Sequence, residues 1–347
     1  MLSCLTSPIL VRLATVVFVA TFVLSLSAVP VPPLDVPNLT DSAELIVVGR
    51  VAHVWETSRS DMEVRGTIMP VQAIRADMQV DRVLKGTLNI LPLTIEFLMP
   101  ISPGGSMGYH GILQSTYRVV FLKHGDHGYE FASPYYPSLV AVPGVSMHGE
   151  TPLDAIVTEL SAVLKASLSS PDEKREAVLA LGTIRTSSAS EALRAANTSQ
   201  DVSVRFVAVQ GLLLRNDFTG LRMAVDELLQ PRSGIPHMSH NLAYAISQSR
   251  PDERSIPEVS RLLHSASVET RRAAASALRN TGSRSAIDGL TTALSDNDFE
   301  VRYFGVIGLA EITGQSEWRP LEDEFKSNEQ RYLSHWLQWA TANTTNR

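Results

Sequence analysis

Cysteine is almost absent from this chain of 347 residues, and the only one is Cys4. It precedes an apolar run that has the pattern of a secretory signal, so removal of that segment leaves a mature chain without cysteine. Such a chain forms no disulfide.

An excess of positive charge is also missing. The formal net charge is −6, with 8 Lys and Arg against 12 Asp and Glu in residues 29–150, and 21 against 24 in residues 151–347. Neither half therefore has the basic surface that binds nucleic acid or anionic lipid. A nucleic-acid partner is excluded on this ground.

The first 28 residues predict a signal peptide. A single positive charge, Arg12, precedes the apolar run Leu13–Leu26, and small residues lead to a cleavage site near Ala28. The alternative is an uncleaved anchor, because residues 9–29 are just long enough to cross a bilayer. In both cases we expect the rest of the chain to be exported, either periplasmic or secreted, with membrane contact only through a retained anchor.

The next part of the chain has the pattern of short strands. Residues 29–40 are rich in proline and predict an extended linker. Residues 41–150 contain runs of β-branched and aromatic residues separated by turn residues, with no clear amphipathic helix. The runs are Leu45–Val54, Thr67–Val83, Leu91–Leu98, Tyr117–Lys123 and Tyr129–Ala132. This pattern favours a small β-barrel or sandwich.

After Thr151 the apolar period changes from 2 to 3.6, and the sequence repeats. Similar eight-residue units begin 31, 34, 32 and 31 residues apart, at 174–181, 205–212, 239–246, 271–278 and 302–309. Most units are followed by a turn and a second helical pattern. Two helices in about 31 residues predict an α-solenoid. We therefore expect a two-domain α+β protein with about five HEAT-like helix pairs over residues 151–341 and a disordered tail, 342–347.

The repeats resemble a known family. The segments DVSVRFVAVQGL (201–212) and DFEVRYFGVIGL (298–309) resemble the bacterial HEAT-like repeats of the phycocyanobilin-lyase type. The resemblance implies the fold and not the lyase activity, because no cysteine remains to hold a chromophore. More faintly, AELIVVGRV, VDRVLKGTL and YRVVFLK are similar to netrin-like, or metalloprotease-inhibitor-like, domains of the OB type. That family's inhibitory cysteine is missing, so inhibition is not implied.

Catalytic and metal-binding patterns are weak. Gly104–Gly108 matches the nucleophile-elbow motif around Ser106, but prolines precede it and no helical run follows. His124, Asp126 and His127 lie where a hairpin turn is expected, and a further ligand such as His110 or His148 is needed for a metal. His237 and His240 are three residues apart, a spacing that places both on one face of a helix, and no other feature marks them as ligands. We therefore expect no catalytic residue, no metal site and no cofactor.

Arginine recurs at the repeat period, at Arg205, Arg271 and Arg302. A ladder that binds anions is one interpretation. We prefer a structural one, in which each arginine bridges to an acidic residue or a helix end of an adjacent copy.

Aligned second helices place Asp226, Glu227, Arg261 and Thr292 in one row of mixed charge. This row predicts a protein partner whose identity the sequence does not give. The expected function is that of an exported, non-catalytic scaffold or adaptor. Two alternatives stay open: a hydrolase or metal-dependent enzyme that uses the 104–110 loop or the 124–127 turn, and an inhibitor or sensor that acts through the strand domain.

Overall fold

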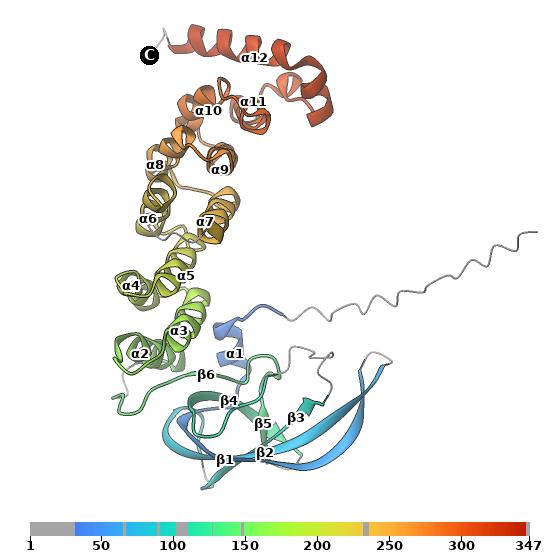
Figure 1. Ribbon diagram of the computed structural model, residues 1–347, viewed down its shortest axis with the longest axis vertical. Helices are drawn as coiled ribbons and strands as arrows, with labels where there is room; N and C mark the ends of the chain where they lie inside the picture. The colour runs from blue at the N-terminus through green and yellow to red at the C-terminus, as the bar shows by residue number, and fades with distance from the viewer. Residues whose placement is uncertain are drawn as a thin grey trace, which may run out of the picture.

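The computed structural model describes residues 32–64, 67–88, 91–101, 110–126, 128–146, 149–231 and 236–344. It contains a strand-rich domain followed by a curved array of paired helices (Figure 1). This is the two-domain α+β architecture that the sequence predicts. Segment 1–28, Ser106 with its glycine-rich loop, His127 and His148 lie outside the described residues. Within the described ranges, no helix has the length and hydropathy needed to span a bilayer.

The strand domain is a single sheet that closes on itself. β1 pairs with β2 along most of its length and with β4 over Leu45–Arg50, so the order β1-β2-β3-β5-β4 forms a ring. β5 runs parallel to β3 and antiparallel to β4, and β6 pairs with β4 beside β5. The strands are β1 Leu45–Val64, β2 Thr67–Lys85, β3 Leu93–Pro100, β4 Tyr117–Gly125, β5 Gly128–Phe131 and β6 Ser138–Val140.

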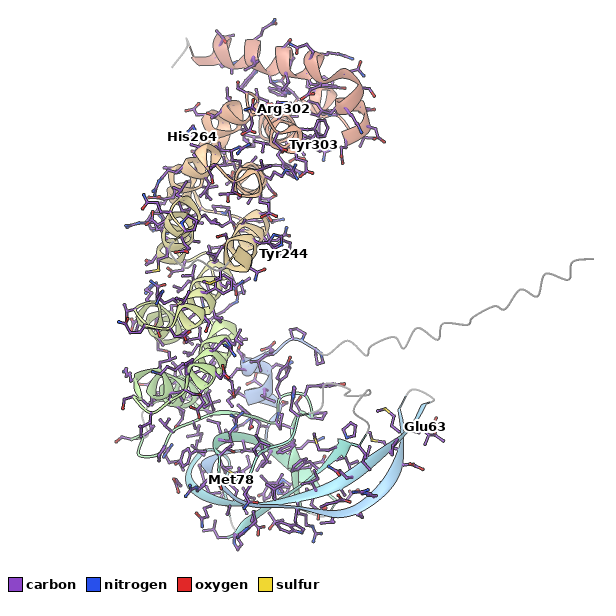
Figure 2. All side chains as sticks on the ribbon, viewed as in Figure 1. Glu63, Met78, Tyr244, His264, Arg302 and Tyr303 are labelled. Atoms are coloured by element: carbon purple, nitrogen blue, oxygen red, sulfur yellow. The ribbon has the colours of Figure 1, made fainter. Side chains whose placement is uncertain are left out.

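β1 and β2 are longer than the sequence suggests. Past the ring they continue as a two-stranded ribbon, with Glu63 near its far end (Figure 2). Residues 57–61 are polar and exposed on this ribbon. No alternation of apolar and polar side chains marks such a segment, and the predicted strand therefore ended too early.

The sequence predicts an extended linker over residues 29–40. The structure instead has a helix, α1, at Val36–Ser42. Asp35 caps this helix by accepting a hydrogen bond from the backbone N–H of Asn38, and Pro37 lies in the first turn, where its missing N–H costs nothing. Val36 is buried, and its N–H donates to Thr183 Oγ1 of α3 at 3.1 Å. Packing against the helical array thus orders a segment that its prolines suggest is extended.

The array consists of a leading helix and five pairs. The leading helix α2, Pro152–Lys165, begins as predicted, with Thr151 as its cap and proline in the first turn. The first helices of the pairs are α3 Pro171–Thr183, α5 Val202–Leu213, α7 Pro236–Gln248, α9 Val268–Asn280 and α11 Phe299–Thr313. The second helices are α4 Ser187–Ala196, α6 Phe218–Leu229, α8 Ile256–Arg261, α10 Ile287–Ala293 and α12 Glu322–Thr344. A 3-10 turn, Leu262–His264, continues α8.

Small residues let the helices approach closely. A Cβ atom added at Gly305 of α11 would lie 2.9 Å from the carbonyl oxygen of Leu290 on α10. One added at Gly308 would lie 2.9 Å from the Leu290 side chain. Glycine at these positions therefore sets the distance between the two helices of the last pair.

Besides a core inside the ring of strands, which includes Ile95 and Leu122, two hydrophobic cores run along the described part of the molecule. The first joins strand residues such as Phe121 with side chains of α1 to α5, including Ile156 and Leu181. The second runs from Val209 of α5 through α6 to Trp336 of α12. Because strand and helix residues share the first core, the strand domain and the beginning of the array fold against each other as one unit.

The two cores meet within the second pair, on α5, where Leu212 belongs to the first core and Leu213 to the second. Between the second and third pairs, α5 and α7 pack against each other much less than α3 with α5 or α7 with α9. The third copy lacks the acidic residue that starts most of the others, and residues 232–235 before it lie outside the described ranges. The regular stacking of first helices is therefore interrupted at this point.

The C-terminal end differs from the disordered tail that the sequence predicts. Helix α12 runs to Thr344, so the first residues of the expected tail, 342–347, are helical. Asn328 has non-helical backbone angles, and the helix is kinked there. The aromatic residues Trp318, Tyr332 and Trp336 pack around this end and cover the last pair. They serve as the cap that a repeat array requires.

Candidate functional site

First and second helices form opposite sides of the array. α5, α7 and α9 lie on one side, and α4, α6 and α8 lie on the other (Figure 1). The strand domain and α12 both project on the side of the first helices, so this side is concave. Tyr244 lies on the first-helix side and His264 on the second-helix side (Figure 2).

The first-helix side exposes large apolar residues. Leu179 of α3 and Tyr244 of α7 occupy the same position of their eight-residue units, and they are 52% and 65% exposed. Leu214 at the end of α5 lies one helical turn beyond that position and is 69% exposed. We call these three residues the apolar row. Each of three successive first helices therefore exposes one large apolar side chain.

Charged side chains continue this surface over α7, α9 and α11. A shallow cavity of about 260 Å³ is lined there by His240, Tyr244, Glu269, Arg272 and Phe304, among others. His240 Nδ1 lies 3.0 Å from Glu269 Oε1. Arg272 donates two hydrogen bonds to Asp298, at 2.8 and 2.7 Å. A mixed surface of this kind suits a polypeptide better than a polyanion.

The predicted row on the second helices is partly tied together. Arg261 Nη2 donates to Asp226 Oδ1 of the preceding second helix at 3.1 Å, and Arg261 Nη1 donates to Glu258 at 2.5 Å. Thr292 donates to the carbonyl oxygen of Asp288 in its own helix at 3.0 Å. Asp226, Arg261 and Thr292 are exposed, whereas Glu227 is half-buried. The row lies on the convex side.

The recurring arginines make one contact in common. The Nη1 atom of each donates to the backbone carbonyl six residues earlier: Ser199 at 2.6 Å for Arg205, Ser265 at 3.0 Å for Arg271 and Asp296 at 2.8 Å for Arg302. Each guanidinium therefore binds the turn that follows the preceding second helix.

Two of the three arginines also bind a carboxylate. Arg271 donates from Nε and Nη2 to Asp296, at 2.7 and 3.1 Å, and Arg302 donates from Nε to Glu329 at 2.5 Å. The hydrogen bond to Asp296 raises the pKa of Arg271. Burial alone raises the pKa of Asp296, but Arg271 and a backbone N–H outweigh it and hold that pKa below 3.8. Both groups are therefore charged at neutral pH.

A cavity of about 440 Å³ lies at the interruption between the second and third pairs. Its lining includes Arg205, Asp226 and Glu227, which the sequence assigned to separate roles. The remaining lining is mostly apolar: Val202, Phe206, Val209, Met223, Met238 and Leu242, with Asn197. The irregular third copy was the only sign of this cavity in the sequence.

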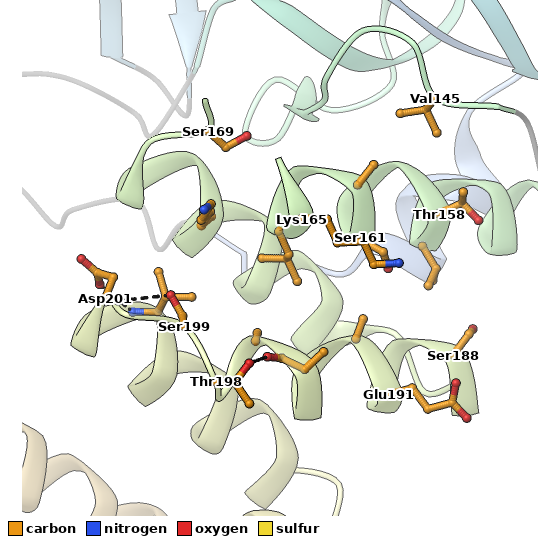
Figure 3. Close-up of a pocket in the computed structure, with 18 of the residues that line it drawn as sticks. Val145, Thr158, Ser161, Lys165, Ser169, Ser188, Glu191, Thr198, Ser199 and Asp201 are labelled. Carbon is orange, nitrogen blue, oxygen red and sulfur yellow. Dashed lines mark hydrogen bonds between the residues drawn. The ribbon is translucent and has the colours of Figure 1, made fainter. Parts of the chain in front are cut away.

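A larger groove of about 980 Å³ lies between α2 and α4 (Figure 3). Thr158, Ser161 and Lys165 of α2 face Ser188 and Glu191 of α4 across it. Its base is made of alanine and valine side chains. Such a groove combines apolar and hydroxyl groups, as many ligand sites do. The sequence pattern does not indicate this groove, because one wall is the leading helix and the other belongs to the first pair.

The candidate metal ligands that lie among the described residues do not converge. His124 Nδ1 contacts Glu44, and this contact holds the pKa of Glu44 below its ordinary value of 4.5. His110 lies near Tyr136, with ring centroids 6.5 Å apart. Among the described residues there is no group of three His, Cys, Asp or Glu side chains placed to hold a metal ion.

Comparisons with known proteins identify the repeats. Residues 242–342 match the family model described as HEAT repeats. The C-terminal part of the chain therefore carries HEAT repeats, as the sequence predicts, in a fold that typically mediates protein interaction. No curated protein matches the chain.

Several solved structures show a similar helical-repeat architecture. The complex of CpcE and CpcF of phycocyanin lyase from Nostoc sp. PCC7120 is 18% identical, covering 52% of this chain and 72% of that one, with a TM-score of 0.36. A designed armadillo repeat protein in complex with the peptide (KR)4 is also 18% identical, covering 46% and 82%, with a TM-score of 0.32. An engineered protein is 21% identical, covering 47% and 82%, with a TM-score of 0.34. These likenesses concern the fold alone.

Proposed function

We propose that this chain is an exported, non-catalytic scaffold that holds a protein partner on the concave, first-helix side of its helical array. The observation that carries this proposal is the apolar row, in which Leu179, Leu214 and Tyr244 are exposed on three successive first helices. Exposed apolar side chains that recur on one face mark interaction surfaces. Export is supported by the N-terminal pattern around Arg12 and by the lack of cysteine after Cys4.

A capture experiment tests this function. The full mature chain is immobilised and exposed to the exported fraction of its source, and a second sample carries Leu214→Ser with Tyr244→Ser. Loss of apolar area from the centre of the surface is expected to reduce capture at least about tenfold. The control is Leu168→Ser, because Leu168 is 97% exposed in the loop between α2 and α3 and is not part of the apolar row. Equal capture by the control and the double variant contradicts the proposal.

The row of Asp226, Glu227, Arg261 and Thr292 is a second candidate surface. It is supported by its mixed charge and by its extension over three second helices. It opposes the first candidate across the array, so substitutions on each side separate the two.

Two other functions use the strand domain. A hydrolase or metal-dependent enzyme needs the 104–110 loop or the 124–127 turn, and labelling of Ser106 by a serine-directed probe or metal retained after purification supports it. An inhibitor or sensor needs a target that binds the ring of strands. We interpret that ring as an OB-type barrel, because β1 closes it by pairing with both β2 and β4.

A further inference from the structure

Arg205 differs from the two arginines that occupy the same position in later copies. All three place Nη1 on the carbonyl six residues earlier, which holds their guanidinium groups in the same way. Arg271 and Arg302 then direct their remaining donors at Asp296 and Glu329. Within the described residues, Nε and Nη2 of Arg205 contact no carboxylate and no other acceptor.

The sequence explains the missing partner. Asp296 follows Arg271 by 25 residues, and the residue at the same distance after Arg205 is Gln230. An amide carries no charge, so it does not replace the carboxylate of the later copy. The second copy therefore keeps the cation and lacks its anion.

Arg205 is one of the residues that line the cavity of about 440 Å³ between the second and third pairs. Val209, Met238 and Leu242 are buried in its wall, and Phe206 and Met223 are half-buried. Asp226 also lines it, but its carboxylate is paired with Arg261. Glu227 lines the cavity as well and is half-buried, so the donors of Arg205 lie in a cavity that combines an apolar wall with two acidic side chains.

The first copy repeats this pattern. Lys174 takes the position of Arg205 there and lines the larger groove between α2 and α4. Its ammonium forms no ion pair with any residue in the described part of the chain. Among the described residues, the cation at this position therefore lacks an internal anion in the first two copies, whereas it is paired with a carboxylate in the last two.

From this internal comparison we infer that Arg205 binds the carboxylate of an aspartate or glutamate side chain of a polypeptide partner, and that the apolar wall holds the residue next to it. The later copies show the geometry: a carboxylate 2.5 to 2.7 Å from Nε. This inference rests on the proposed function and names the chemistry of the partner. A hydrogen bond between charged groups is stronger than a neutral one, so glutamate is preferred over glutamine.

Two fluorescent, end-blocked peptides test the inference on the full mature chain: Gly-Leu-Glu-Leu-Gly and the same peptide with glutamine at the centre. We expect the glutamate peptide to bind at least about tenfold tighter, measured by fluorescence anisotropy at low salt. Arg205→Gln is expected to bring the ratio to about one, and Arg205→Lys to restore part of it. Arg222→Gln is the matched control, because Arg222 is exposed on α6 outside the cavity. Thermal unfolding of each variant verifies that it is folded.

A ratio near one for the wild-type chain overturns the inference, and so does a ratio that Arg205→Gln leaves unchanged. The proposed function and the inference about Arg205 can be contradicted independently of each other. If the apolar-row substitutions abolish capture of the natural partner while Arg205→Gln leaves capture unchanged, the proposed function is supported and the inference about Arg205 is contradicted. If the peptides show the Arg205-dependent preference but the apolar-row variant captures the partner normally, the carboxylate site is supported and the proposed binding on the concave side is contradicted.

Discussion

Arg82 of β2 and Glu159 of α2 form a bidentate ion pair across the junction of the strand domain and the helical array, at 2.7 and 2.8 Å. The Arg82 side chain is 12% exposed and that of Glu159 is 2% exposed. Arg82 also donates to Tyr117 Oη at 3.2 Å and to the carbonyl of Val142 at 3.3 Å. Each nitrogen of the guanidinium therefore has an acceptor, and the pair fixes the orientation of α2 on the sheet.

Removing one member of this pair leaves the other buried and unpaired. We expect Glu159→Gln to lower the free energy of unfolding by about 3 kcal/mol, because an uncompensated buried charge is costly. Urea unfolding of the full mature chain measures it. The control is Glu56→Gln, which breaks the exposed pair of Glu56 with Arg59 and is expected to cost less than about 1 kcal/mol. Equal losses in the two variants would show that the junction does not bury its charges.

The helical array without the strand domain is expected to be unstable. Residues 151–347 alone expose the part of the first core that Phe121, Ile46 and Val119 cover in the intact chain. We predict a broad, non-cooperative unfolding transition or aggregation for this fragment, measured by circular dichroism on heating. A sharp transition at the temperature of the full chain would contradict the shared core. Binding experiments therefore use the full mature chain.

The C-terminal cap is expected to weaken in acid. The rings of His335 and Trp318 stack with centroids 3.6 Å apart, and His335 Nε2 is buried without a hydrogen-bond partner in the described residues. Burial lowers the pKa of His335 below its ordinary value of 6.5, and Glu317 opposes this only in part. A lowered pKa means that the neutral ring is favoured when folded. Its contribution to stability is complete above pH 6.5 and is lost as the pH falls through the folded pKa.

The measurement for this prediction is the melting temperature between pH 7.5 and about 5. We expect the wild-type chain to lose more stability over this range than His335→Phe, which keeps an aromatic ring against Trp318 and has no proton to bind. The carboxylates titrate in both proteins, so the difference between them isolates His335. Parallel curves for the two proteins would show that the ring is already able to protonate in the folded state.

The second-helix row has its own test. Arg261 contacts Asp226 and Glu258 through side chains that are 23% to 53% exposed, so these are surface pairs. We expect Arg261→Ala combined with Glu227→Ala to change the free energy of unfolding by less than about 1 kcal/mol. If the second-helix row contacts the partner, this variant captures less of the partner while its melting temperature is unchanged. A large drop in melting temperature would instead give these residues a structural role.

The sequence predicts elements whose cause is local. The period near 31 residues places the helix pairs, and the caps at Thr151, Asp201 and Asp298 begin helices where expected. Helix α1 was missed because its burial against α3 comes from a contact 147 residues away. The ribbon of β1 and β2 was missed because its residues 57–61 are polar on both faces.

The candidate sites depend on contacts between copies, and few of these are visible in a single sequence. The repeat register does identify Arg205, Arg271 and Arg302 as equivalent. It does not show that the first of them faces a cavity and the other two face carboxylates. That difference arises where α5 and α7 separate, and it depends on the length and composition of the connection before the third copy. The pairing of Arg82 with Glu159 spans 77 residues and has no local signal.

The most direct test of the proposed function locates the partner on the array. A photo-crosslinking amino acid is placed at Tyr244 on the concave side and, in a second protein, at His264 on the convex side, both of which are exposed. Each full mature chain is irradiated with the exported fraction, and crosslinked products are identified by mass spectrometry. We predict one dominant product from position 244 and none from position 264. A product from position 264 alone would place the partner on the second helices and contradict the proposal.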